Sequence, residues 1–368
     1  MQKTIQISKP VIGEEEINAV VEVLRSGNLS QGPIVARLEK EFAKFCGTKY
    51  AVALGNGTAT LHTALHALGV GPNDEVITSP FTFVATVNAI LMQNAKVVFC
   101  DIEDTYFNID PEKLEKKITK KSKTIMPVDL FGHIYDVAAV NKIAKKHKLT
   151  VVEDAAQSVD AEYKSKKAGN VADIASFSLY ATKNLTAGVG GMLTTNSKRM
   201  MEKCKLFRHH GQKEGDPYAY VEFGYNYRMM DMIASIALEQ LKKINWFTKR
   251  RRENAKRYNE ELADIKGLIL PKEREGYKHV YHQYTLRVTK DFKLTRDAFI
   301  THLEKNNIQA RIYYPKPLHL YPHLKYLGYK KGDFPVAEKL ADEVVSIPVH
   351  PLVEKEQIDY IIKTIKNI

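Results

Sequence analysis

Residues 150–157 read TVVEDAAQ, a short apolar run that ends in an acidic pair. Seven such apolar runs lie between residues 50 and 196, and helix-like segments separate most of them. This alternation predicts a mostly parallel sheet that is covered by helices on both faces. Ligands bind such sheets where strands end and helices begin, so Glu153 and Asp154 lie where an α/β enzyme places functional groups.

The predicted elements follow the apolar runs and the periodic segments. A first helix begins near Glu14, where an acidic triplet suits a helix N-terminus, and ends at Gly27. The predicted strands are residues 50–54, 75–78, 96–100, 124–128, 150–152, 174–178 and 192–195. The helices predicted between them are residues 58–68, 82–92, 111–118 and 137–147.

The pattern changes around Trp246. A long polar helix is predicted through residues 250–262. After it come predicted strands at residues 281–288 and 309–314 and predicted helices at residues 296–306, 337–343 and 355–365. We therefore predict a large domain over residues 1–245 and a smaller α+β domain over residues 246–368.

The composition is that of a globular enzyme, with 44% hydrophobic and 27% charged residues among 368. The formal net charge is +12, and its densest basic runs are residues 116–123 and 249–257. Solvated helix faces or loops are the ordinary explanation for such runs, and a field that steers an acidic substrate is the alternative. Neither an RNA-binding motif nor a zinc finger accompanies the charge, so we predict no nucleic-acid partner.

Cysteine usage and hydropathy predict a cytoplasmic protein. The three cysteines are odd in number and form no C-x-x-C motif, which argues against a disulfide framework. No signal-peptide core and no apolar run of membrane-spanning length is present, so no membrane partner is predicted. His62 and His66 lie one helical turn apart without a third ligand, and we predict no metal site.

Two segments have the residue types of a cofactor site. Residues 55–60 read GNGTAT between a predicted strand and a helix, where free N–H groups and the Thr58 hydroxyl suit a phosphate, although an ordinary helix cap has the same pattern. Asp154 suits the carboxylate that faces the pyridine nitrogen of pyridoxal phosphate and keeps it protonated, although a capping or loop-anchoring aspartate would also lie there.

Lys183 follows a predicted strand and precedes the glycine-rich residues 188–191. A lysine in such a tight loop is partly desolvated, which lowers its pKa and frees the amine to form an imine. Most lysines are solvated surface residues, so the loop alone does not decide whether Lys183 is an imine-forming lysine or a solvated one. Asn226 and Arg228, two residues apart in an aromatic segment, suit an anionic ligand or an anchored loop.

Taken together and in this order, the motifs resemble the DegT/DnrJ/EryC1/StrS family of pyridoxal-phosphate-dependent sugar aminotransferases. The resemblance covers nearly the whole chain. The matching segments are residues 57–59, 82–90, 153–157, 178 with 182–184, 224–229, 314–319 and 332–338.

The resemblance implies the fold-type I aminotransferase fold, with a large, mostly parallel seven-stranded sheet domain and a smaller C-terminal domain. It also implies a homodimer with active sites shared at the interface. Lys183 is then the lysine that binds the cofactor covalently and moves the proton, and Asp154 is the partner of the ring nitrogen. The remaining implied contacts are Phe83 against the ring, Gln157 on its phenolic oxygen side, Gly57, Thr58 and Ser178 at the phosphate, Asn226 at the phosphate of the neighbouring subunit, and Arg228, Tyr314 and His319 towards the substrate.

The implied reaction moves an amino group from a donor, glutamate, to a nucleotide-diphosphate keto-sugar and leaves 2-oxoglutarate. Amination at C4 of a deoxysugar is favoured over C3. An amino-cyclitol ketone as substrate, or a regulatory protein that has kept the fold without turnover, are the alternatives. The sequence departs from the common family pattern at Val189, Asp129 and Asp160, where many members have an acidic residue, His and Gly, and these changes bear on the identity of the sugar.

Overall fold

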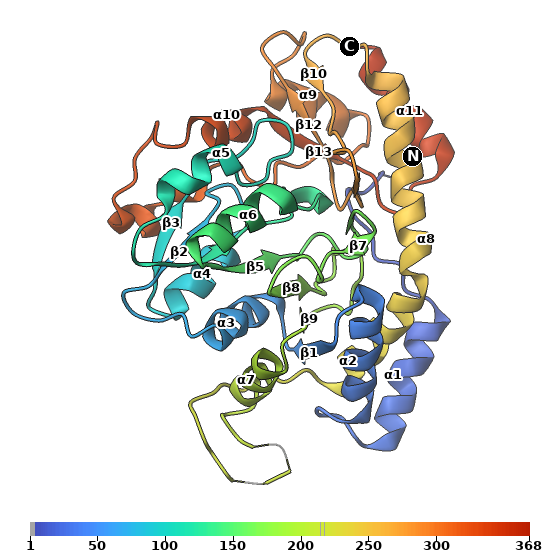
Figure 1. The fold of residues 1–368 in the computed structure, drawn as a ribbon. Coiled ribbons are helices and arrows are strands. Elements are labelled where there is room, and N and C mark those ends of the chain that lie inside the picture. Colours follow the sequence, from blue (N-terminus) through green and yellow to red (C-terminus); the bar gives the residue numbers. More distant parts are fainter. Residues whose placement is uncertain (1–3, 214, 217) are drawn as a thin grey trace.

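A seven-stranded sheet forms the centre of the computed structural model, which describes residues 4–213, 215–216 and 218–368 (Figure 1). The strand order is β1-β9-β8-β5-β4-β2-β3. The strands are β1 (Tyr50–Leu54), β2 (Glu75–Thr78), β3 (Lys96–Phe99), β4 (Ser122–Met126), β5 (Thr150–Asp154), β8 (Ile174–Ser178) and β9 (Gly191–Thr195).

Five neighbouring strands of this sheet run parallel, and β9 alone runs antiparallel between β8 and β1. The predicted fold, a mostly parallel seven-stranded sheet in an α/β domain, is therefore confirmed. In the β8–β9 pair Ser178 lies opposite Gly191, so the residues between them form a closed loop at the end of the sheet. That loop carries Lys183.

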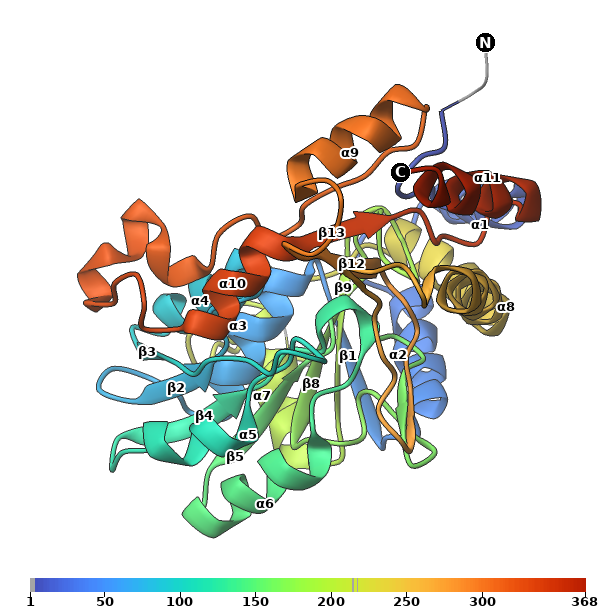
Figure 2. The same ribbon diagram turned by 90° about the horizontal axis from the view of Figure 1, so that it is seen from above.

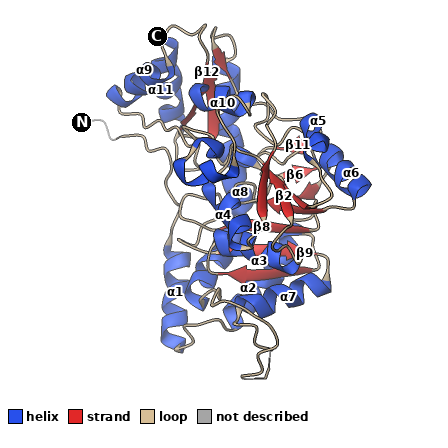
Figure 3. Ribbon diagram, turned by 90° about the vertical axis from the view of Figure 1, so that its left-hand side faces the viewer, coloured by secondary structure: helices blue, strands red, loops and turns tan. Residues whose placement is uncertain are grey.

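Helices cover both faces of the sheet because its strands are apolar on both sides (Figure 3). One face packs on α2 (Pro33–Cys46), α6 (Val137–His147) and the first half of α8 (Asp231–Leu262). The other packs on α3 (Gly57–Ala67), α4 (Val84–Met92), α7 (Lys198–Arg208) and α10 (Pro335–Glu343). The remaining helices here are α1 (Glu14–Ser26), α5 (Pro111–Leu114) and 3-10 turns at Glu115–Lys117 and Leu130–Gly132.

The C-terminal part has its own three-stranded antiparallel sheet, in the order β10-β12-β13, and its own core (Figure 2). Its elements are β10 (Leu268–Ile269), β12 (Tyr284–Val288), β13 (Val344–Ile347), α9 (Arg296–Lys305), α11 (Lys355–Lys366) and 3-10 turns at Leu318–Leu320 and Pro322–Leu327. A second small sheet, in the order β11-β6-β7, joins Tyr277–Lys278 to the hairpin of Glu162–Tyr163 and Lys166–Lys167.

Helix α8 corrects the prediction of a helix that starts near residue 250. It begins at Asp231 and runs beside both parts of the molecule (Figure 1). Its first half buries Ala234 and Ile244 in the large core, and its second half buries Tyr258 and Leu262 in the C-terminal core. One helix thus serves two cores, and the predicted domain boundary at 245/246 falls inside it.

Two further predictions differ from the structure. Residues 309–314 form no strand and make only an isolated bridge between Arg311 and Ser346. The N-terminus belongs with the C-terminal part, because Ile5 pairs with Ile308 and packs in that core. In the described part of the chain, no helix combines the length and the hydropathy needed to cross a bilayer.

Candidate active site

Asp154 is the last residue of β5, and its carboxylate lies buried at the carboxyl end of the sheet. Its backbone N–H donates to Pro127 O at 2.9 Å, which fixes it against the neighbouring strand end. Thr86 Oγ1 donates to Oδ2 at 2.8 Å, and the N–H of Ala156 donates to Oδ1 at 3.3 Å. Burial raises the pKa of Asp154, and these donors together with the positive charge of Lys183 oppose the rise.

Lys183 lies in the loop between β8 and β9, and backbone hydrogen bonds hold that loop. The N–H of Leu179 donates to Gly190 O, that of Ala187 to Leu179 O and that of Lys183 to Tyr180 O, each at 2.8–2.9 Å. The side chain is only half-buried, yet the surrounding protein desolvates its amine and lowers the pKa of Lys183 to about 8, while the Asp154 carboxylate opposes that shift. The structure thus brings Lys183 and Asp154 together. A lysine that is readily deprotonated lies beside a buried carboxylate.

Gly57, Thr58 and Ser178 meet where α3 begins. A Cβ placed on Gly57 would lie 2.9 Å from Ser178 Cβ and 3.2 Å from its Oγ, so only glycine allows this approach. Asn56 caps the helix by accepting from the N–H of Ala59 at 2.8 Å. The start of an 11-residue helix and two hydroxyl groups form a cradle that suits a phosphate.

Phe83, Gln157 and Tyr314 surround this region from three segments. Phe83 is the N-cap residue of α4, one turn before Thr86, and it is 62% exposed, which leaves it accessible to a ligand. Gln157 is buried: its Oε1 accepts from the N–H of Phe131 at 2.7 Å and its Nε2 donates to Tyr314 Oη at 2.8 Å. The amide of Gln157 therefore positions Tyr314, which interacts electrostatically with Asp154. Their predicted ligand contacts stay predictions.

Three predicted residues lie apart from Asp154 and Lys183. Asn226 and Arg228 are joined to each other by an Nε–Oδ1 hydrogen bond of 3.0 Å on an extended segment. That segment passes Gly55, whose N–H donates to Tyr227 O at 2.8 Å. His319 is buried, and its Nε2 lies 3.0 Å from Glu338 Oε1, so its polar partner is inside the chain and its predicted substrate contact stays a prediction.

A buried pair of acidic residues, which the sequence did not indicate as a pair, lies near Asp154. Asp129 and Glu153 are fully buried; Ser158 Oγ donates to Asp129 at 2.6 Å and the N–H of Gly169 donates to Glu153 at 2.8 Å. Burial raises the pKa of Asp129 to about 7 and also raises that of Glu153, and the nearby Asp129 carboxyl group adds to the rise at Glu153.

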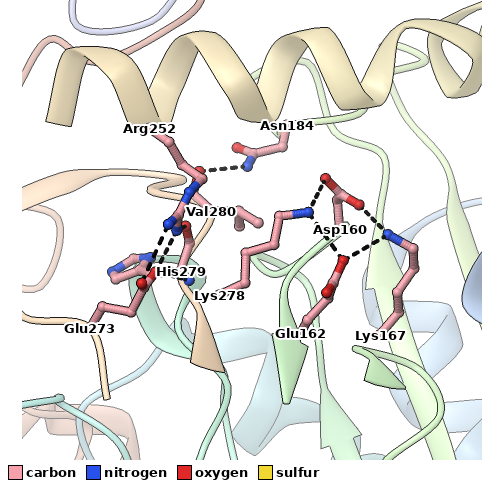
Figure 4. Close-up of polar contacts among 9 residues, drawn as sticks. All are labelled: Asp160, Glu162, Lys167, Asn184, Arg252, Glu273, Lys278, His279 and Val280. Atoms are coloured by element: carbon pink, nitrogen blue, oxygen red, sulfur yellow. Dashed lines mark hydrogen bonds and ion pairs between the residues drawn. The ribbon is translucent and has the colours of Figure 1, made fainter. Parts of the chain in front are cut away.

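The departure at Asp160 has a structural basis. Its φ is 72°, in the left-handed region where glycine is free of strain. The buried carboxylate forms ion pairs with Lys167 and Lys278, which hold it in place (Figure 4). Asp160 and Lys278 line a cavity of about 730 Å³ alongside α8. Val189 is exposed on the Lys183 loop.

Named relatives cover nearly the whole chain. A pleiotropic regulatory protein of Geobacillus stearothermophilus is 42% identical, covering 95% of this chain and 93% of its own. GDP-perosamine synthase of Caulobacter vibrioides is 34% identical, and the match covers 99% of this chain and 98% of that protein. UDP-2-acetamido-2-deoxy-3-oxo-D-glucuronate aminotransferase of Pseudomonas aeruginosa is 35% identical, covering 96% of each chain.

Solved structures share the fold. The PLP form of the putative sugar aminotransferase Spr1654 from Streptococcus pneumoniae superposes with a TM-score of 0.94 at 31% identity, covering 99% of this chain and 98% of that one. The sequence profile of the DegT/DnrJ/EryC1/StrS aminotransferase family matches residues 10–366. With Lys183, Asp154 and the Gly57–Ser178 cradle arranged as described, the chain belongs to the DegT/DnrJ/EryC1/StrS aminotransferase family.

Proposed function

We propose that this protein is a pyridoxal-phosphate-dependent aminotransferase that moves an amino group from L-glutamate to a nucleotide-linked keto-deoxysugar, at C4 in preference to C3. One observation carries the proposal: a lysine whose pKa burial lowers to about 8 lies beside a buried carboxylate, at the carboxyl ends of parallel strands. A lysine and a carboxylate in this arrangement are the two groups that pyridoxal-phosphate chemistry requires.

The residues present fit pyridoxal 5'-phosphate. Asp154 is a buried acid with no arginine partner among the described residues, and it is free to pair with a protonated ring nitrogen. Gly57 lets the start of α3 approach Ser178 more closely than a Cβ would allow, which brings the helix N-terminus and the Ser178 hydroxyl together. When bound, the cofactor supplies an aldehyde and an electron-withdrawing ring that stabilises a carbanion at the donor Cα.

Lys183 has two roles in this proposal. Its neutral amine would hold the cofactor covalently, and a donor amine would compete with it for that position. The released Nζ then takes the proton from the donor Cα and gives it up again within the same site. Asp154 stays ionised and keeps the ring nitrogen protonated, and Thr86 and the N–H of Ala156 orient its two oxygens.

The names of relatives support a nucleotide sugar as acceptor. One relative is a GDP-perosamine synthase and another acts on a UDP-linked 3-oxo sugar. Because the second name specifies C3, the test includes both positions. The purified protein is incubated with glutamate and pyridoxal phosphate and then with GDP-, UDP- and dTDP-linked 4-keto and 3-keto sugars, and mass spectrometry detects the products.

We expect a stoichiometric amino sugar from a nucleotide-linked 4-keto sugar. Amination of only the 3-keto compounds would contradict the C4 preference, and amination of only an amino-cyclitol ketone would contradict the nucleotide sugar. The name of one relative, a pleiotropic regulatory protein, is the ground for the alternative of a regulatory protein without turnover. If glutamate did not convert the bound cofactor to its amine form at all, the regulatory function would replace the proposed aminotransferase activity.

Gly57→Ala tests the phosphate cradle. The added Cβ lies within 3.0 Å of Ser178, so the start of α3 must move away from it. Overpacking costs about 1–3 kcal/mol, which corresponds to a roughly tenfold to hundredfold loss of cofactor affinity. Equilibrium dialysis measures the affinity. Gly71→Ala is the control, since no atom lies within 4 Å of that Cβ, and equal affinity in both variants would remove Gly57 from the cofactor site.

The Lys183 pKa predicts how cofactor loading depends on pH. Only the neutral amine attacks an aldehyde, and the pKa of Lys183 is lowered to about 8. The rate of attachment to the cofactor-free protein should therefore rise about tenfold per pH unit up to about pH 8 and level off above it. Stopped-flow absorbance measures this rate. A midpoint near the ordinary lysine value of about 10.4 would show that Lys183 is not desolvated in solution.

The segment between α7 and α8 supports a dimer with shared sites. It projects from the body and carries exposed aromatic residues, with Tyr218 81% and Phe223 68% exposed (Figure 1). An exposed apolar patch of this kind is typical of an interface. We propose that Asn226, at the base of this segment, completes the phosphate site of a second copy.

Mixing two inactive variants tests this sharing. In a heterodimer of Lys183→Ala and Asn226→Ala chains, one of the two sites has both residues intact. After subunit exchange in an equal mixture we expect about a quarter of the wild-type activity, because half of the dimers are mixed. Each variant alone should stay inactive. No recovery after exchange, verified by native mass spectrometry, would show that Asn226 serves its own chain.

A further inference from the structure

Asn184, the residue after Lys183, connects the catalytic loop to the segment before β12. Its Nδ2 donates to Val280 O at 3.4 Å (Figure 4). Its Oδ1 lies 3.1 Å from His282 Nδ1. That segment is itself fixed, because the N–H of Val280 donates to Gly132 O and Arg251 Nη1 donates to His282 O. The imidazole of His282 is therefore held in a defined place beside the Lys183 loop.

The hydrogen bonds define the tautomer of His282. The Asn184 amide must present Nδ2 to the Val280 carbonyl, because two oxygens facing each other would repel. Its Oδ1 then faces the imidazole and can only accept, so His282 Nδ1 carries the proton. In the neutral ring this leaves the lone pair on Nε2 free to accept. Within the described chain, Nε2 makes no hydrogen bond with a protein group.

His282 stays neutral because of its surroundings. The side chain is buried, and burial lowers the pKa of His282 well below its ordinary value. Lys183 from the β8–β9 loop, Arg251 from α8 and His279 from the same segment lower it further, and these three are the charged or titratable groups that act on it. The neutral imidazole of His282 therefore adds no second positive charge beside Lys183, and it offers a hydrogen-bond acceptor instead.

We propose that His282 Nε2 accepts a hydrogen bond from the Lys183 ammonium while that ammonium holds the proton taken from the donor Cα. This inference rests on the proposed function. It assigns to His282 the role of holding the Lys183 ammonium, and to Asn184 the role of orienting His282. The step needs such an acceptor because Asp154 is then engaged with the ring nitrogen. His282 is a positioning residue in this scheme.

The proton balance is simple. Lys183 Nζ leaves the cofactor as a neutral amine, gains one proton from the donor Cα and becomes an ammonium with three N–H donors. One N–H points to His282 Nε2, which keeps its lone pair and takes no proton. Lys183 then gives the same proton to the cofactor carbon and is neutral again. His282 ends each half-reaction in the state in which it began.

The tautomer is tested without activity. Nitrogen-15 NMR of full-length protein with labelled histidine distinguishes a ring protonated at Nδ1 from one protonated at Nε2, and the signal missing in His282→Gln identifies the residue. We expect a neutral ring protonated at Nδ1 from pH 6 to 8, and an Asn184→Ala variant that loses this preference. A ring protonated at Nε2, or a cationic ring at pH 7, would overturn the proposal.

The kinetic test separates an acceptor from a space-filling ring. His282→Phe keeps the ring volume without an acceptor, whereas His282→Gln keeps a carbonyl oxygen. A hydrogen bond to a charged group corresponds to roughly a tenfold to hundredfold effect, so conversion of bound cofactor by glutamate should slow by that factor in His282→Phe. In His282→Gln we expect it to recover to within about threefold. His302→Gln, on α9 and bonded to Thr364 O, is the control.

The isotope effect distinguishes the proton step from a structural defect. With glutamate deuterated at Cα, the effect should increase in His282→Phe, because proton transfer then limits the rate, while the glutamate KM stays within about threefold. Equal rates in wild type and His282→Phe, or a loss in KM alone, would refute the inference. Absence of any glutamate-driven conversion in the wild type would instead refute the proposed function.

Discussion

Replacing Lys183 by alanine should abolish covalent attachment of the cofactor and slow transamination by about a thousandfold or more. The residue has two roles, covalent bond and proton transfer, and general acid–base catalysis alone contributes about 10²–10⁴. The fold should survive, because within the described part of the chain the Lys183 side chain makes no hydrogen bond or ion pair and lies only half-buried. Borohydride reduction followed by peptide mass spectrometry measures the attachment.

The same experiment locates the reactive amine among the lysines of the chain. In wild type we expect one modified lysine, in the peptide containing residue 183, and none in the Lys183→Ala protein. Lys198→Ala is the matched control, since that lysine is exposed on α7 and should leave attachment unchanged. Modification of another lysine, with turnover retained in Lys183→Ala, would refute the assignment and with it the proposed reaction.

Local patterns were enough to predict the central sheet. Residues 50–54, 75–78 and 174–178 form strands with the predicted bounds, because each is a short apolar run bounded by turns or loops. The helix at residues 137–147 also has its predicted bounds, since Asp136 caps it and His147 ends it. The position of Lys183 between β8 and β9 follows from the same runs, so the loop of the catalytic lysine was visible in the sequence.

Contacts between distant segments explain what the sequence did not predict. Thr86 reaches Asp154, and His282 reaches Asn184, across long stretches of chain whose approach depends on the order of the strands. The contact between Asp129 and Glu153 likewise exists only because β4 lies beside β5. Helix α8 was predicted too short because its buried face changes partners midway, from the large core to the C-terminal core.

Asp154→Asn should lower kcat by about a hundredfold or more while leaving the fold intact. The amide has the shape of the carboxylate and still bonds to Thr86, but it cannot keep a ring nitrogen protonated, so the donor carbanion loses its electron sink. Covalent attachment at Lys183 should persist, because it does not require the charge. The expected signature is thus a protein that takes up cofactor and reacts slowly with glutamate.

Stability separates this loss of function from a folding defect. Burial raises the pKa of Asp154 above its unfolded value, so its ionisation in the folded state costs stability as pH rises through the folded pKa. Removing the charge should leave the melting temperature at pH 7.5 unchanged or higher.

Asp173→Asn is the control for Asp154→Asn. It removes a carboxylate that accepts from the N–H of Val151 at 2.8 Å, at the opposite end of β5, and it should leave kcat unchanged. If Asp154→Asn turned over glutamate within about threefold of wild type, the carboxylate would not be the partner of the ring nitrogen, since a neutral amide cannot replace a charge that the reaction needs.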